Sequence, residues 1–202
     1  MTPTDAPDAG LRRAVLVVAI LNGAYFGIEF AVAVAIGSVS LLADSVDFLE
    51  DASVNLLIFF AIAWAARTRS LVGRGLAVLI LVPALATIWI AVAKILDPQP
   101  PEVGALSLAA AGALAINLLS AVLLVRHRHH AGSLPKAAWL SARNDALANL
   151  AIIAAALVTL VWQSGWPDIV VGIGIGLLNA DAARAVWLAA RAERPGVEEA
   201  EA

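Results

Sequence analysis

The chain has 202 residues, of which 61% are hydrophobic and only 14% are charged, and its formal net charge is −3. A soluble domain has about 45–50% apolar and about 25% charged residues, so much of this chain requires the bilayer as its solvent. The small negative charge gives no support to a nucleic-acid partner. The sequence has no cysteine, which excludes disulfides, thiolate metal sites and cysteine nucleophiles.

Six apolar stretches are long enough to cross a bilayer as helices, which takes about 20 mostly apolar residues each. We therefore expect an all-α bundle of six transmembrane helices over residues 12–190. Residues 1–11 and 191–202 are polar or rich in Pro and Gly, and we expect both to be disordered tails. The expected spans are 12–36, 40–65, 75–96, 104–125, 137–161 and 166–189.

Lys and Arg are distributed unevenly over this arrangement. Twelve of the 13 lie in or near the termini, the second connector (67–74) and the fourth connector (126–136), whereas Lys94 lies near the opposite face. The positive-inside rule therefore predicts a multi-pass protein of the inner (plasma) membrane with both termini in the cytoplasm. A cleaved signal peptide over residues 12–36 is the competing interpretation. It is disfavoured because the apolar run is too long and has Glu29 at its middle.

The second expected span carries four acidic residues, each of which costs about 3 kcal/mol on insertion scales. Asp47 and Asp51 lie one turn apart on one helix face, and Asn55 follows one turn later. Asp44 joins the same stripe, whereas Glu50 lies off it. Ionisable residues at this depth predict a functional site.

The fifth expected span carries a matching stripe, in which Ser141, Asp145 and Asn149 repeat at intervals of four. Carboxylates one turn apart on two facing helices bring several oxygens together, and oxygen ligands suit divalent cations. Two alternatives remain open: hydrogen bonding between helices, as expected of the single asparagines Asn22 and Asn117, and a proton relay without metal. Further candidates for metal ligands or proton-linked groups are Asp44, Asn144, Asn149, Asn55, Glu29 and Glu50.

Three motifs are spaced along the expected spans. Residues 37–51 read Gly-Ser-Val-Ser-Leu-Leu-Ala-Asp-Ser-Val-Asp-Phe-Leu-Glu-Asp, residues 144–149 read Asn-Asp-Ala-Leu-Ala-Asn, and residues 166–172 begin Trp-Pro-Asp and end in Gly. Together they resemble the cation diffusion facilitator family of metal/proton antiporters. The resemblance implies a six-helix cation-transport domain with cytoplasmic termini, assembled as a homodimer.

The resemblance also implies a mechanism and a tetrahedral metal site. The protein would be a secondary transporter, not an enzyme, that exports a divalent cation (Zn²⁺, Mn²⁺, Fe²⁺, Co²⁺ or Cd²⁺) as H⁺ enters. Its metal site would combine two residues of the second span with two of the fifth. Carried over position by position, these are Asp47, Asp51, Ser141 and Asp145.

Two features differ from the family pattern. Ser141 stands where the family usually has histidine, and the loss of an imidazole ligand favours harder ions such as Mn²⁺ or Fe²⁺ over Zn²⁺. The sequence given ends at Ala202 without the cytoplasmic metal-binding domain of many relatives, so we expect any dimer to form through membrane helices. Gly172-x-x-x-Gly176 is one candidate dimer face, and close packing within one subunit is the competing interpretation.

The fourth connector contains His127, His129 and His130 among arginines. Relatives often have a histidine-rich loop there, so a metal-collecting loop is expected. A positively charged membrane anchor explains the cluster equally well. Two other function classes remain: a non-transporting membrane metal-binding subunit or sensor, and an intramembrane metalloenzyme. The enzyme is disfavoured because the sequence has no His-Glu-x-x-His motif.

Overall fold

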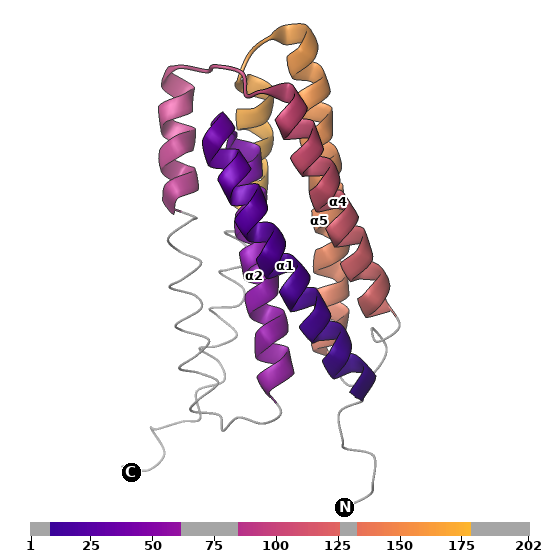
Figure 1. Ribbon diagram of the computed structural model, residues 1–202. Coiled ribbons are helices and arrows are strands. Elements are labelled where there is room, and N and C mark those ends of the chain that lie inside the picture. Colours follow the sequence, from indigo (N-terminus) through magenta and orange to yellow (C-terminus); the bar gives the residue numbers. More distant parts are fainter. Residues whose placement is uncertain (1–8, 62–84, 126–132, 179–202) are drawn as a thin grey trace, which may run out of the picture.

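The structure, a computed structural model, describes residues 9–61, 85–125 and 133–178, and its regular structure there is helical throughout (Figure 1). The expected all-α fold is therefore confirmed. Two shorter apolar helices span Leu85–Leu96 and Trp166–Leu178. The four long helices are α1 (Ala9–Ile36), α2 (Val39–Ala61), α4 (Val103–Val125) and α5 (Ser133–Trp162).

Three of the long helices are apolar enough to cross a membrane along Gly10–Ile36, Val103–Val125 and Ser141–Trp162. Helix α2, with 23 residues, is also about 35 Å long, but its acidic residues make it less apolar. The two shorter helices are the described parts of the expected spans 75–96 and 166–189, which continue outside the described ranges. The expected tails also lie outside these ranges, except that residues 9–11 belong to α1.

The four long helices form two antiparallel pairs, α1 with α2 and α4 with α5 (Figure 1). Helix α1 also contacts α4, and α2 contacts α5, so the pairs join into one bundle. Alanines fill much of the interior and let the helix backbones approach closely. Large apolar side chains such as Trp89 and Val161 lie on the outside, as a lipid-facing surface requires. The core includes Ala33, Leu41, Leu42, Ala110, Ile152 and Ala156.

A tight turn joins α1 to α2. Gly37 has a φ of 64°, in the left-handed region that glycine adopts without steric penalty. The Oγ of Ser38 accepts a hydrogen bond from the backbone N–H of Leu41 at 3.2 Å and so caps the start of α2. The turn sends α2 back along α1, so polar residues of the two helices meet in antiparallel register.

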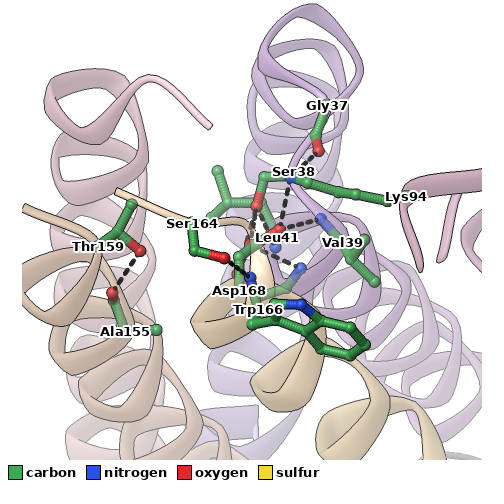
Figure 2. A network of polar contacts seen from close by, with 11 residues as sticks. Gly37, Ser38, Val39, Leu41, Lys94, Ala155, Thr159, Ser164, Trp166 and Asp168 are labelled. Atoms are coloured by element: carbon green, nitrogen blue, oxygen red, sulfur yellow. Dashed lines mark hydrogen bonds and ion pairs between the residues drawn. The ribbon is translucent and has the colours of Figure 1, made fainter. Parts of the chain in front are cut away.

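The buried carboxylate of Asp168 binds the same turn from the last described helix (Figure 2). It accepts hydrogen bonds from the backbone N–H of Val39 at 2.8 Å and of Ser40 at 3.2 Å, and from Ser38 Oγ at 2.6 Å. The two backbone N–H groups are donors that a helix N-terminus leaves without partners inside the helix. The negative charge also lies at the positive end of the α2 dipole, where it is stabilising.

Lys94 completes this network. Its Nζ lies 3.0 Å from Asp168 Oδ2, and it also donates to the carbonyl oxygen of Gly37 (Figure 2). Both charged side chains are buried. Asp168 thus connects the helix Leu85–Leu96, the helix Trp166–Leu178 and the start of α2.

The connectors at this end of the bundle also contact one another. The backbone N–H of Gly165 donates to the carbonyl of Pro98 at 2.8 Å. This bond joins the connector 97–102 to the connector 163–165. A Cβ on Gly172 would lie 2.7 Å from the carbonyl carbon of Val39, whereas one on Gly176 would meet none of the described residues within 4 Å. Gly172 therefore serves close packing within the chain, which favours that interpretation of its motif over a dimer face.

We predict that Asp168→Asn destabilises the protein strongly. The substitution leaves the buried Lys94 ammonium without its counter-charge, and breaking a buried ion pair in this way costs about 3–5 kcal/mol. The Tm of the purified protein in detergent would measure the loss. Asp97→Asn, which changes an exposed carboxylate nearby, is the matched control. Equal Tm values for the two variants would contradict the prediction.

Candidate metal site

Helices α2 and α5 meet at Asp51, Ser141 and Asp145. Ser141 Oγ lies 3.0 Å from Asp51 Oδ1 and 3.4 Å from Asp145 Oδ2. A hydroxyl has one hydrogen to donate, so it bonds one carboxylate at a time, and the shorter distance favours Asp51. The four-residue spacing on each helix places these side chains on the facing surfaces.

Asp47 lies one turn before Asp51 on the same face of α2 and is half-buried. Its carboxylate is close enough to Asp145 and Asp44 to interact with their charges. Of the four residues that the resemblance assigns to the metal site, Asp51, Ser141 and Asp145 form one hydrogen-bonded group. The fourth, Asp47, lies beside this group. In the described part of the chain, however, no three acidic or histidine side chains yet converge closely enough to hold a metal ion.

Asn22 of α1 also reaches this group. Its Nδ2 lies 3.4 Å from Asp51 Oδ2, and its own Oδ1 is buried without a hydrogen-bond partner among the described residues. Hydrogen bonding between helices is one of the alternatives that the sequence leaves open for Asn22. A single amide in an apolar span signals a buried polar contact, but the sequence does not say which residue it contacts.

A second polar group links α4, α5 and α2. Asn117 Nδ2 donates to Asn149 Oδ1 at 3.1 Å, and Asn149 Nδ2 in turn donates to Asp44 Oδ2. All three side chains are buried. Asn117 and Asn149 therefore form a hydrogen bond between helices, which is one of the alternatives that the sequence leaves open.

The other candidate residues lie outside these two groups or outside the described ranges. Asn55 Nδ2 donates to the backbone carbonyl of Asp51 at 2.8 Å, within its own helix. Asn144 is exposed, and its Oδ1 lies 3.4 Å from Arg143. Glu50 is half-buried on α2, away from the facing stripe. The expected metal-collecting residues, His127, His129 and His130, fall outside the described residues.

The model of the cation efflux transmembrane domain matches residues 15–190 of the sequence. The chain belongs to the cation efflux family. The match covers the facing stripes of α2 and α5 and agrees with the resemblance found in the motifs. Members of the cation efflux family are transporters, so this chain is a multi-pass membrane protein with a cation as substrate and the lipid bilayer as its surroundings. No curated protein matches the sequence significantly.

We predict that Asn149→Leu lowers the Tm of this cation efflux protein far more than Asn144→Leu. The first change leaves Asn117 Nδ2 and Asp44 Oδ2 buried without a partner, at about 1–3 kcal/mol for each group. The second removes an exposed amide. Thermal unfolding of both variants in the same detergent would measure the difference. Equal losses would show that the buried amide chain contributes nothing to stability.

Proposed function

We propose that this chain is a secondary transporter that exports a divalent metal cation in exchange for protons. The observation that carries the proposal is the position of Asp51 and Asp145, on facing helices within hydrogen-bonding distance of one hydroxyl. Together with Asp47, these carboxylates neutralise a dication and leave one negative charge to attract it. The same oxygens also bind protons, so metal and proton compete for them. Such competition is the basis of antiport.

We further propose that the protein lies in the inner (plasma) membrane, crosses it six times and has both termini in the cytoplasm. The support is the arrangement of the three described connectors, which lie at one end of the bundle and contact one another (Figure 1). Six alternating crossings leave both termini at the other end, where the sequence places most Lys and Arg residues. A homodimer through membrane helices follows from the family resemblance.

The substrate in this proposal is a hard divalent cation, Mn²⁺ or Fe²⁺ ahead of Zn²⁺. The side chains grouped around Ser141 offer oxygen atoms, and Zn²⁺ favours nitrogen and sulfur ligands. The sequence has no cysteine, and its three histidines lie together in the fourth connector. Co²⁺ and Cd²⁺ belong in the same comparison.

We predict that Mn²⁺ flux into proteoliposomes requires a pH gradient and falls to background in Asp51→Asn and Asp145→Asn. Each variant keeps the shape of the side chain but loses the charge that binds the cation. Flux would be followed with a Mn²⁺-sensitive dye trapped inside the vesicles. Asp97→Asn, an exposed carboxylate away from both polar groups, is the matched control and should retain full flux.

Three outcomes would overturn parts of the proposal. Flux in both folded variants would remove Asp51 and Asp145 from the site. Flux that ignores the pH gradient would exclude antiport. Stoichiometric metal binding by the unaltered chain without flux of any ion would instead support a non-transporting metal-binding subunit or sensor.

We predict that Ser141→His raises flux of Zn²⁺ relative to Mn²⁺ by at least about tenfold, because an imidazole nitrogen suits Zn²⁺ better. Ser141→Ala is the matched variant, since it removes the hydroxyl without adding nitrogen. It should leave the ratio of the two fluxes near that of the unaltered chain. The same shift in both variants would show that the ligand at this position does not set selectivity.

A further inference from the structure

Glu29 is an ionisable group that is buried among apolar helices. It lies in α1 with 0% of its side chain exposed, and neither carboxylate oxygen has a hydrogen-bond partner within the described residues. An ionised carboxylate removed from water loses several kcal/mol of hydration unless a partner replaces it. A cation or a proton bound at this point of the bundle would offset that loss.

Asp44 of α2 lies beside Glu29. The antiparallel register that pairs Asn22 with Asp51 also places Glu29 opposite Asp44, and the charges of the two carboxyl groups interact. Asp44 is fully buried, and its Oδ1 also has no hydrogen-bond partner among the described residues. The pair therefore presents three unpaired oxygens, two from Glu29 and one from Asp44.

The amide chain behind Asp44 orients it as a ligand. Asn149 accepts from Asn117 through its Oδ1, so its Nδ2 must point the other way, toward Asp44 Oδ2. This donor holds one oxygen of Asp44 in place and leaves the other for a ligand. Side chains that bind metals are commonly held by such outer hydrogen bonds, which fix their orientation.

This pair lies at a different level of the bundle from the group around Ser141. Asn22 and Glu29 are two turns apart on α1, as are Asp51 and Asp44 on the antiparallel α2. The seam between these helices thus has two polar levels about 10 Å apart. Asn22 meets Asp51 at the first level, and Glu29 meets Asp44 at the second, which lies nearer the Gly37 turn.

We propose that Glu29 and Asp44 form a second divalent-cation site, between the group around Ser141 and the connector end of the bundle. Their two charges neutralise one dication, and oxygen ligands suit ions such as Mn²⁺. A cation that moves from the first level toward the Gly37 turn would bind next at this site. This inference rests on the proposed function in taking the substrate to be a divalent cation.

The test is the number of Mn²⁺ ions bound per chain by the purified full-length protein in detergent, with free Mn²⁺ measured by electron paramagnetic resonance. Glu29→Gln should lose one bound Mn²⁺ relative to the unaltered chain, and Asp145→Asn should lose the other. The combination of both substitutions should lose two. Asp97→Asn is the matched control and should lose none.

Folding of each variant would be checked by its Tm and by gel filtration. Glu29→Asp, which keeps the charge, should recover the ion that Glu29→Gln loses. Asp44→Asn removes the other charge of the pair while retaining an acceptor for Asn149, so it tests the same site if Glu29→Gln does not fold.

An unchanged Mn²⁺ count in folded Glu29→Gln or Asp44→Asn would overturn the proposal and assign the shared position to a proton. Failure of the proposed function has a different signature, since it would appear as absent flux in proteoliposomes. A chain that binds both ions without transporting them would keep the second site and remove the transporter.

Discussion

The buried carboxylate of Asp168 is the interaction on which the arrangement of the bundle depends. It takes the free backbone donors at the start of α2 and the ammonium of Lys94, and so joins three segments that lie far apart in the sequence. Because α2 is fixed at this end, the axial position of every carboxylate along it is fixed as well. The stripe of Asp44, Asp47 and Asp51 faces α5 at a defined depth for this reason.

The same fold buries acidic groups with very different degrees of compensation. Asp168 has an ammonium and several donors, Asp51 has the hydroxyl of Ser141 and the amide of Asn22, and Glu29 has no hydrogen-bond partner among the described residues. A fully compensated carboxylate holds helices together and has no oxygen left for a ligand. A poorly compensated one needs a mobile cation, and that difference separates structural acids from those that suit a transported ion.

The contacts that fix α2 and the side chains proposed to bind a cation lie at different levels of the bundle. The connector contacts and the capping of α2 lie at one end of the bundle (Figure 1), whereas Ser141 of α5 bonds Asp51 of α2. A change of the residue at position 141 would therefore alter the chemistry offered to a cation while the Asp168 network at the other level stays the same. Members of one family can differ in metal preference on a common scaffold in this way.

The sequence by itself determined the helical class, the approximate bounds of the helices and which faces of α2 and α5 carry polar residues. Apolar length and four-residue spacing suffice for these, because both are properties of a single helix. Only the tertiary structure decided that Asn22 meets Asp51, that Glu29 lies beside Asp44, and that Lys94 pairs with Asp168 across 74 residues. In a nearly all-apolar helix every face has a similar hydropathy, so the sequence does not show which neighbouring helix each face contacts.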